Sequence, residues 1–562
     1  MKQIVVVVIA VLLYLPTKAE VFIVNSVGSF NSAQNNANAG DSILWQNGIY
    51  EDVRLTIDED DLHVSAMNVG MTVFTGRSSV SITGSDVVFR GFQFVDGDID
   101  DDHIIDIRGD RVLFEEVNIR DYICYKYLIV REESQYVTIR YCNFENRINL
   151  DDQNILSILV NGNHPGFHKI QYCSFKNFDG EGNDFGIEPI RIGVSTQAQY
   201  NSRSLVEFCY FTRCDGDGEI ISSKASQNVY RYNTFENNPL SELVLRHGSE
   251  NIVYGNFFMN GKGGVRVREG QHHYIYNNYF YDIDDRPIFL QNEDSDPLDD
   301  INIAFNLIHD SEEIRLGGDN GDDPPTNVTF ANNIFSDPKD DLFDDPTNDE
   351  MWIANISWGD LGFSRPGGIV SVDPQLVENA EGYFSISENS PAIDAAEPGY
   401  KPIPQYEGMD EVDSEMLLDI MIENRSAIQE EKDLGCSEYP HEVLVRPHVN
   451  EENTGPHYDT SILSNIEPPQ EIDDFDIEIF PNPVINTLRM RMNTSDAEDI
   501  EISLFDSKGT FLRSLFTAEK FIGLLSISRD VSDLPQGQYM IQYISTRDES
   551  TEMSKTFQIV KI

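Results

Sequence analysis

Basic side chains are scarce in this sequence of 562 residues. Only 40 Lys and Arg stand against 96 Asp and Glu, and the formal net charge is -56 at pH 7. Binding to nucleic acid needs a basic surface that neutralises phosphates, so this balance excludes nucleic acid as a partner. An anionic ligand of another kind must meet a locally basic surface.

Long apolar runs are also missing, except at the N-terminus. Met1-Lys2-Gln3 is followed by an apolar run over residues 4–15 and then by Pro16-Thr17-Lys18-Ala19, which is the pattern of a secretory signal peptide. A membrane-spanning helix needs ~20 apolar residues, so this run is too short to cross a bilayer. We therefore expect a signal peptide over residues 1–19, no membrane span, and a protein that is secreted or held at the cell surface.

A repeated phrase fills the region between about 85 and 340. Its anchors recur at steps of 22 to 36 residues: Phe94, Ile119, Phe144, Phe175, Phe211, Phe235, Phe258, Phe280, Ile308 and Phe335. Repeats of this length are typical of solenoids. Short β-branched and aromatic runs bounded by polar residues favour strands. The expected fold is all-β, a right-handed parallel β-helix with neighbouring coils ~4.8 Å apart.

A second column of residues stands two positions before the anchors. It reads Phe92, Val117, Cys142, Cys173, Cys209, Asn233, Asn256, Asn278, Asn306 and Asn333. In stacked coils, an Asn column can bond side chain to side chain, and a Cys column can pack as small hydrophobes. We interpret the three cysteines as structural. Disulfides or a metal cluster are the alternative, although the chain has none of the CxxC spacings of zinc sites.

The remaining chain divides into further segments. The repeats end near Ser390-Pro391-Ala392-Ile393-Asp394, which predicts a β-helix domain over residues 20–460 with an insertion at 401–435 and a linker at 461–474. Alternating runs with Pro and Gly turns predict a small β-sandwich over residues 475–562.

The phrases of this C-terminal segment, such as Ile479-Phe480-Pro481-Asn482-Pro483, resemble the C-terminal sorting domain of the type IX secretion system of Bacteroidetes. The resemblance implies the type IX secretion machinery as a partner. A carbohydrate-binding module is the alternative.

Charged residues concentrate around Asp217 to Gly248. Lys224 precedes Arg246 by 22 residues, about one coil, so both are expected on adjacent coils at the same face. Asp217 and Glu219, two apart on a predicted strand, share one face. Neighbouring carboxylates repel unless they are protonated or bind a cation, and oxygen ligands in a secreted protein point to Ca²⁺.

The same region is an exception to the acidic composition. Residues 224–270 hold six Lys or Arg and four Glu, a balance of +2. A basic face beside a cation site suits an anionic sugar, whereas a solvated face with balanced charges is the plainer interpretation. Three Asp-rich stretches, at 96–102, 294–300 and 319–323, are interpreted as solvated loops rather than Ca²⁺ sites. His272 and His273 could contact substrate or serve an ordinary turn.

Five segments together carry a resemblance to polysaccharide lyase family 6, which contains alginate lyases and a dermatan-cleaving chondroitinase. They are Glu219 to Lys224, Asn228 to Phe235, Arg246-His247-Gly248, Gly263 to Val267 and Asn277-Asn278-Tyr279-Phe280. The resemblance implies that Lys224 is the base that takes the C5 proton and that Arg246 protonates the leaving oxygen at C4. It also implies that Asp217 and Glu219 hold Ca²⁺ against the uronate carboxylate.

Four further positions match the lining of the family's substrate cleft: Arg191, His247, Arg266 and Arg147, the last standing where family members often have Lys.

The predicted Ca²⁺ site departs from the family in two ways. The family usually has Glu where this chain has Asp217, and its third ligand, an Asn, would fall on Phe185. Either Asn183 or Asp184 then substitutes for that ligand, or the ligand is absent.

The function implied is a Ca²⁺-dependent polysaccharide lyase that cleaves an anionic polysaccharide, alginate first, by β-elimination. A chondroitin or dermatan sulfate lyase would use the same base, acid and cation. A non-catalytic glycan-binding β-helix protein is the alternative from a different class.

Overall fold

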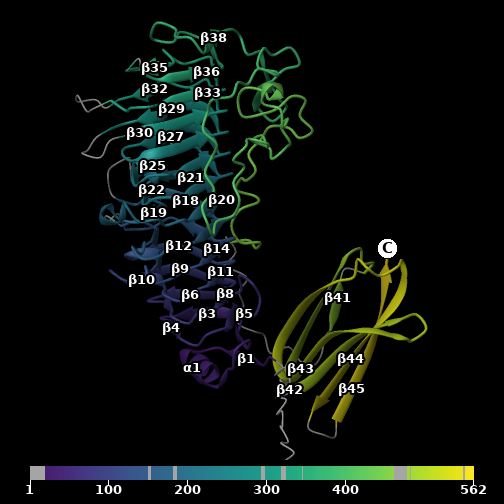
Figure 1. The fold of residues 1–562 in the computed structure, drawn as a ribbon. Coiled ribbons are helices and arrows are strands. Elements are labelled where there is room, and N and C mark those ends of the chain that lie inside the picture. Colours follow the sequence, from purple (N-terminus) through teal and green to yellow (C-terminus); the bar gives the residue numbers. More distant parts are fainter. Residues whose placement is uncertain are drawn as a thin grey trace, which may run out of the picture.

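A computed structural model of the chain describes residues 19–149, 153–180, 186–292, 298–317, 324–344, 346–347, 349–460, 477–480, 482–547 and 551–562. Short strands stack coil upon coil into a long solenoid (Figure 1). The strands of its two large sheets, of 14 and 24 strands, pair in parallel with the coil before and the coil after. The predicted fold class, an all-β chain built on a parallel β-helix, is confirmed.

The coils place their strands in three parallel ladders. Ladder A is the 14-stranded sheet, whereas ladders B and C share the 24-stranded sheet because two long strands take part in both. Ladder A contains β1 (Val21–Val24), β2 (Ser42–Trp45), β5 (His63–Ala66), β8 (Val88–Arg90), β11 (Leu113–Glu115), β14 (Thr138–Arg140), β17 (Lys169–Gln171), β20 (Leu205–Glu207), β23 (Val229–Arg231), β26 (Ile252–Tyr254), β28 (Gln271–Tyr276), β30 (Asp299–Ala304), β33 (Thr329–Ala331) and β36 (Met351–Ile353).

Ladder B carries the anchors. It contains β3 (Gly48–Glu51), β6 (Thr72–Gly76), β9 (Phe92–Asp98), β12 (Asn118–Ile123), β15 (Asn143–Glu145), β18 (Ser174–Asp179), β21 (Tyr210–Asp215), β24 (Thr234–Glu236), the two shared strands β27 (Phe257–Val267) and β29 (Tyr279–Leu290), β31 (Leu307–His309), β34 (Ile334–Ser336), β37 (Asn355–Trp358) and β38 (Ile369–Ser371).

Ladder C carries the candidate site. It contains β4 (Arg54–Ile57), β7 (Ser79–Ile82), β10 (His103–Ile107), β13 (Lys126–Val130), β16 (Leu156–Ile158), β19 (Ile190–Ile192), β22 (Glu219–Lys224), β25 (Glu242–His247), the shared strands β27 and β29, β32 (Ile314–Leu316) and β35 (Phe343–Asp344).

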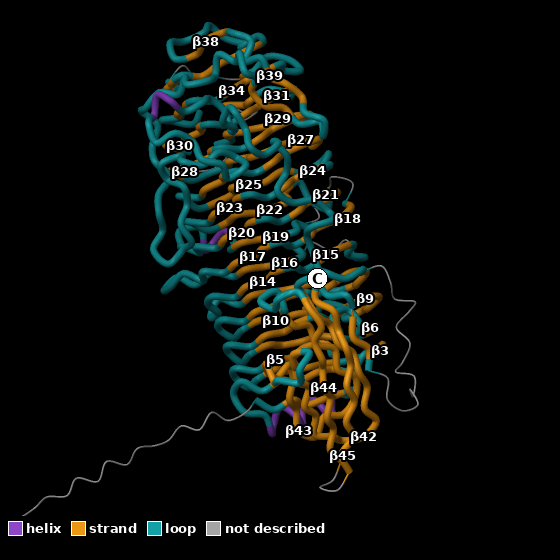
Figure 2. The backbone as a smooth tube through the Cα atoms, turned by 90° about the vertical axis from the view of Figure 1, so that its right-hand side faces the viewer, coloured by secondary structure: helices purple, strands orange, loops and turns teal. Residues whose placement is uncertain are grey.

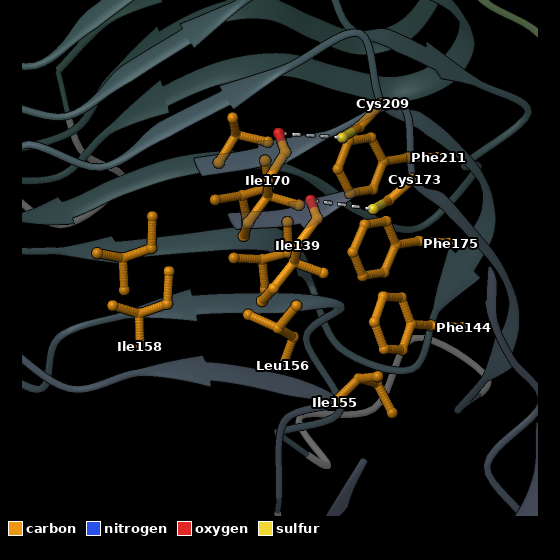
Figure 3. Close-up of a cluster of buried hydrophobic side chains, with 14 of the residues drawn as sticks. Ile139, Phe144, Ile155, Leu156, Ile158, Ile170, Cys173, Phe175, Cys209 and Phe211 are labelled. Carbon is orange, nitrogen blue, oxygen red and sulfur yellow. Dashed lines mark hydrogen bonds between the residues drawn. The ribbon is translucent and has the colours of Figure 1, made fainter. Parts of the chain in front are cut away.

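The anchors form one continuous column inside the solenoid. Each anchor pairs with the anchor of the next coil, from Phe94 to Phe335. Successive Phe rings stack nearly parallel, with centroids 5.0 Å apart for Phe175 and Phe211 and 4.7 Å apart for Phe211 and Phe235. Figure 3 shows three of these rings in line. The predicted stacking is confirmed, because equal positions in parallel coils must face equal surroundings.

The column two positions before the anchors behaves as predicted. Each Asn amide donates to the Asn oxygen of the next coil, from Asn233 at 3.0 Å up to Asn333, which donates to Asn355 at 2.9 Å. The cysteines of this column, Cys142, Cys173 and Cys209, are buried and free. Their structural interpretation is confirmed.

A short helix covers the first coil. Helix α1 (Val27–Asn36) begins after Ser26, whose hydroxyl accepts the Ser29 N–H, and it buries Phe30 against the coil core. The helix shields the open end of the solenoid, where unpaired strand edges would otherwise meet solvent.

The segment after the last coil, residues 387–460, is here called the strap. It follows the small antiparallel pair of β39 (Leu376–Glu378) and β40 (Phe384–Ile386) and contains only the 3-10 turn η2 (Gln429–Glu431); a second turn, η1 (Ser195–Gln197), lies in the coils. Residues 401–435, the predicted insertion, belong to the strap.

The strap runs back along the outside of the coils (Figure 1). Arg425 donates to Asn277 at 3.0 Å, Val449 accepts from Thr234 at 2.8 Å, and Tyr458 donates to the Phe92 carbonyl at 3.2 Å.

The C-terminal segment forms a separate antiparallel sheet of five strands. They are β41 (Glu478–Phe480), β42 (Thr487–Asp506), β43 (Phe511–Asp530), β44 (Gly537–Arg547) and β45 (Thr551–Lys561). Figure 2 shows the long β42 and β43 beside β44 and β45. The sheet has its own apolar core, which includes Leu504 and Ile541.

Candidate active site

Lys224 ends β22, and Arg246 and His247 end β25, the next strand of ladder C. The register shifts here, because Ser223 is opposite Leu245 whereas Lys224 is opposite His247. Arg246 is therefore the extra residue of a β-bulge, a feature that re-aims side chains. Arg246 and His247 both reach the surface, with side chains 31% and 17% exposed. Lys224 and Arg246 lie on adjacent coils, as their spacing predicts.

Three buried carboxylates gather beside this pair. Glu188 precedes β19, Asp217 lies in the turn before β22, and Glu219 begins β22. Their oxygens lie within 4.8 Å of one another. Asp217 accepts the N–H of Gly186 at 2.9 Å and that of Glu219 at 3.0 Å. Asp217 was expected on a strand; it lies in the turn instead, and these two backbone contacts hold its carboxylate in the cluster.

The cluster has the donor set that a hard cation requires. Glu219 Oε1 accepts from Arg246 at 2.5 Å, whereas its Oε2 is buried and has no hydrogen-bond partner in the described part of the chain. Carboxylate oxygens alone suit Ca²⁺. The residues present therefore fit the predicted ion. Two of the predicted ligands, Asn183 and Asp184, lie outside the described residues.

Arginines balance the buried acids. Arg191 Nη2 contacts both Glu188 oxygens at 2.6 Å, and Arg268 stands 3.9 Å from Glu219. Burial raises the pKa of Glu188, Arg191 opposes the rise, and the charge of Glu219 adds to it. A divalent ion would relieve this mutual repulsion of the carboxylates.

The Lys224 amine is half-buried in this charged setting. Burial lowers its pKa below the ordinary value, and the neighbouring cations Arg191 and Arg246 lower it further, against the opposing charges of Glu188 and Glu219. Within the described ranges, no hydrogen bond or ion pair holds the Lys224 amine. A lysine in this state is poised to lose its proton, as a general base must.

Two predicted substrate ligands lie on the same ladder. His247 Nδ1 is 2.6 Å from the buried carboxylate of Glu269, which fixes the ring. Arg266 lies 3.8 Å from the fully buried Glu242, and its guanidinium sits over the Phe289 ring at 5.5 Å. A guanidinium held between a carboxylate and a ring is rigid, so it presents fixed donors.

Arg147 differs from the others. It is 5% exposed, donates to the carbonyl of Cys124 at 2.8 Å, and also bonds Asn149 and the carbonyl of Gln153. These contacts tie a loop to the coil below. Its substrate contact therefore remains a prediction from the resemblance alone.

His272 and His273 lie on β28 in ladder A, away from the ladder that carries Lys224. His273 is fully buried, and burial lowers its pKa to about 4. His272 pairs with Asp300 at 2.5 Å. These contacts fit the turn role.

Sequence reasoning missed Glu188 and Glu269. Glu188 stands three residues before Arg191, next to Pro189, and that spacing in an acidic loop was the available signal. Glu269 follows Arg268 directly, but only the stacking of coils brings it opposite His247. Neither residue forms a short motif that could be read without the fold.

The part of the chain that carries this site resembles a known family. The sequence model of the chondroitinase B family matches residues 24–288, which include Lys224, Arg246 and the three carboxylates. Residues 24–288 form a chondroitinase B family domain. The predicted resemblance to polysaccharide lyase family 6 is confirmed. No curated protein sequence matches the chain.

Solved structures share the fold of this lyase domain. The family 6 alginate lyase AlyGC superposes with a TM-score of 0.57 at 20% identity, covering 66% of this chain and 55% of AlyGC. A mannuronic acid specific family 6 lyase from human gut microbiota gives 0.53 at 23% identity, covering 63% and 91%. Pedsa3628 from Pseudopedobacter saltans gives 0.50 at 21% identity, covering 63% and 97%. The chain thus spans about half of AlyGC.

The end of the chain carries a second recognised domain. The model of the secretion system C-terminal sorting domain matches residues 478–559. This type IX domain implies export, so the lyase-family protein is secreted or displayed at the cell surface. The predicted signal peptide over residues 1–19 lies, apart from Ala19, outside the described residues. Among the described residues, the structure has no helix of the length and apolarity needed to cross a bilayer.

Proposed function

We propose that the lyase domain is a Ca²⁺-dependent enzyme that cleaves alginate by β-elimination and releases unsaturated oligosaccharides. The observation that carries the proposal is the Lys224 amine: half-buried, of lowered pKa, and one coil from Arg246 beside three buried carboxylates. A positioned base, a positioned acid and a cation site are the parts that removal of a uronate C5 proton requires.

In the proposed reaction the neutral Lys224 amine takes the C5 proton. The electron pair of the broken C5–H bond forms the C4–C5 double bond, and the C4–O bond to the leaving sugar breaks. The Arg246 guanidinium, 31% exposed and oriented by Glu219 at 2.5 Å, gives a proton to that oxygen. The bulge at Arg246 supports this role because it turns the side chain to the same surface as His247.

Glu188, Asp217 and Glu219 would hold the ion. Ca²⁺ bound there would neutralise the uronate carboxylate and so stabilise the charge that develops as the proton leaves. Arg191, His247 and Arg266 would orient the substrate on the same face, since all three are partly exposed on ladder C.

The substrate is tested by incubating the purified protein with alginate, dermatan sulfate and chondroitin sulfate while the ultraviolet absorbance of unsaturated ends is followed. We expect the absorbance to rise with alginate. The matching family model is that of chondroitinase B, so dermatan sulfate is the second candidate substrate. If the absorbance rises with dermatan sulfate alone, that polymer replaces alginate as the proposed substrate. A protein that binds glycan and releases no unsaturated ends would belong to the non-catalytic class.

The pH dependence of turnover should reflect Lys224. Its folded pKa is lowered, first by burial and then by Arg191, so the neutral base forms as the pH rises and kcat/KM should increase on the alkaline side. Arg191→Gln removes a cation that lowers the pKa and frees the charge of Glu188, so the rising limb should move to higher pH. If the rise of kcat/KM with pH stays in place or moves to lower pH in this variant, Lys224 is not the base.

Removal of Ca²⁺ should abolish product formation and also lower the thermal stability of the lyase domain. After chelation we expect a lower melting temperature, and added Ca²⁺ should restore both. Glu219→Gln should bind Ca²⁺ at least ~10-fold more weakly by titration calorimetry, because a direct ligand contributes no less than an outer one. Glu250→Gln, in the turn before strand β26 of ladder A, is the matched control. If Glu219→Gln binds Ca²⁺ with unchanged affinity, other residues form the Ca²⁺ site.

A further inference from the structure

A second cluster of metal-ligating side chains lies in the strap. Asp419, Glu423 and His441 offer ligand atoms that all lie within 4.8 Å of one another. Asp419 and Glu423 belong to a tight turn closed by a bridge between Leu418 and Asn424. His441 approaches from a later part of the strap. None of these residues belongs to the ladder that carries Lys224.

His441 supplies the strongest sign of a missing partner. Both of its ring nitrogens are buried, and neither has a hydrogen-bond partner among the described residues. A neutral imidazole normally donates from one nitrogen and accepts at the other. Buried polar groups in folded proteins are nearly always paired, so two orphan nitrogens on one ring require an explanation, and an unseen ion is one.

The charges around His441 point to a cation. Asp419 and Glu423 lie beside the ring, Glu438 adds a third negative charge that acts on it, and Arg425 is the cation that opposes them. Arg425 is already bound to Glu438 at 2.6 Å. Asp419 is fully buried and receives only backbone N–H groups, from Met421, Glu423 and Glu438. Two negative charges therefore remain without an ion pair in the described part of the strap.

We propose that Asp419, Glu423 and His441 bind one Zn²⁺ ion. One imidazole and two carboxylates form a mixed nitrogen and oxygen set that suits Zn²⁺, whereas Ca²⁺ takes oxygen ligands. The ion matches the two unpaired charges and gives one of the two His441 ring nitrogens a partner. The cluster at Glu188 contains oxygen donors alone, so the two sites prefer different metals.

The proposed ion has a structural role. It ties the turn at Asp419 to the segment around His441, and Arg425 between them holds the solenoid through Asn277 at 3.0 Å. An ion that binds the strap only when the strap is folded stabilises the folded state by mass action. Zn²⁺ should therefore strengthen the docking of the strap on the coils, whether or not the ladder C site turns over substrate.

The test uses the full chain, stripped of metal and titrated with Zn²⁺ in excess Ca²⁺, which keeps the oxygen-only cluster filled. We expect one Zn²⁺ per chain by calorimetry, a higher melting temperature, and visible absorption bands when Co²⁺ replaces Zn²⁺. His441→Ala should bind Zn²⁺ at least ~100-fold more weakly, because losing a direct ligand exceeds the loss of an outer partner. His272→Ala removes a histidine outside the strap, one that pairs with Asp300, and this variant should bind Zn²⁺ as the wild type does.

Glu423→Gln is the second variant, because this half-buried turn residue can lose its charge without a change of size. It should fold, as judged by circular dichroism, and should no longer bind one Zn²⁺ per chain. The proposal is overturned if the wild type binds no Zn²⁺ in excess Ca²⁺. It is also overturned if folded His441→Ala or Glu423→Gln binds Zn²⁺ as the wild type does.

Discussion

Replacing Lys224 with alanine is expected to lower kcat on alginate by ~10²- to 10⁴-fold, the usual contribution of a positioned general base. The amine is half-buried, has a lowered pKa and is held by no described partner. Its removal therefore deletes the proton acceptor and breaks no ion pair. Initial rates of unsaturated product formation, measured at saturating alginate, give the change in kcat directly.

A companion variant separates base catalysis from binding. Lys224→Arg keeps a positive charge that does not dissociate near neutral pH, so it should be as inactive as Lys224→Ala while still binding glycan. The matched control is Lys169→Ala on ladder A, where the lysine pairs with Asp410 at 2.7 Å. This control should keep its rate within about twofold, since surface ion pairs contribute little. A Lys224→Ala protein with more than a tenth of the wild-type kcat would assign the base elsewhere.

Phe211→Ala is expected to destabilise the solenoid by ~3–5 kcal/mol, the range for truncating a buried Phe. Its side chain is fully buried, and its ring stacks on Phe175 at 5.0 Å and on Phe235 at 4.7 Å. The cavity cannot close easily, because the coil spacing is set by the backbone hydrogen bonds of three ladders. Both neighbouring rings would therefore lose contacts.

Denaturant unfolding followed by circular dichroism measures this loss, and hydrogen exchange locates it. Stability in stacked repeats is a sum over neighbouring coils, so exchange should increase first in the strands that flank Phe211. Phe511→Ala is the control, because this Phe of the sorting domain is 55% exposed and should change stability by only ~0.5 kcal/mol. A loss below ~1 kcal/mol in Phe211→Ala would mean that the core refills the cavity.

The lowered pKa of Lys224 also affects folding. The folded state holds the Lys224 proton less tightly than the unfolded state does. The unfolded chain therefore binds more protons, and this group's contribution to stability rises with pH until the unfolded lysine also loses its proton. At neutral pH the half-buried Lys224 therefore lowers the free energy of unfolding. Lys224→Ala should remove this pH-dependent effect on stability.

Much of the lyase domain could be predicted from residue spacing. Anchor residues such as Phe211 and ladder residues such as Asn256 recur once per coil, and parallel stacking puts recurring positions in contact. The same rule placed Lys224 and Arg246 on neighbouring strands. The resemblance to a lyase family added the roles of base and acid, which spacing alone does not assign.

Other features of the site depended on departures from the repeat. Arg246 is the extra residue of a bulge, which shifts the partner of Lys224 to His247. Glu188 completes the carboxylate cluster from the connection between β18 and β19, residues 180–189, which is longer than the equivalent connection of the next coil, residues 216–218. Local patterns cannot specify such positions, because a loop outside the repeat is positioned by packing against other coils.

The sequence by itself determined the coil period, the Phe and Asn columns, the sorting domain at the end and the adjacency of Lys224 to Arg246. These follow from rules that hold within one coil and repeat in the next. The tertiary structure alone decided the third carboxylate Glu188, the pairing of His247 with Glu269 and the cluster at His441. Each joins segments that meet only when a loop or the strap folds onto the stacked coils, where burial and unpaired charge determine which side chains must find a partner.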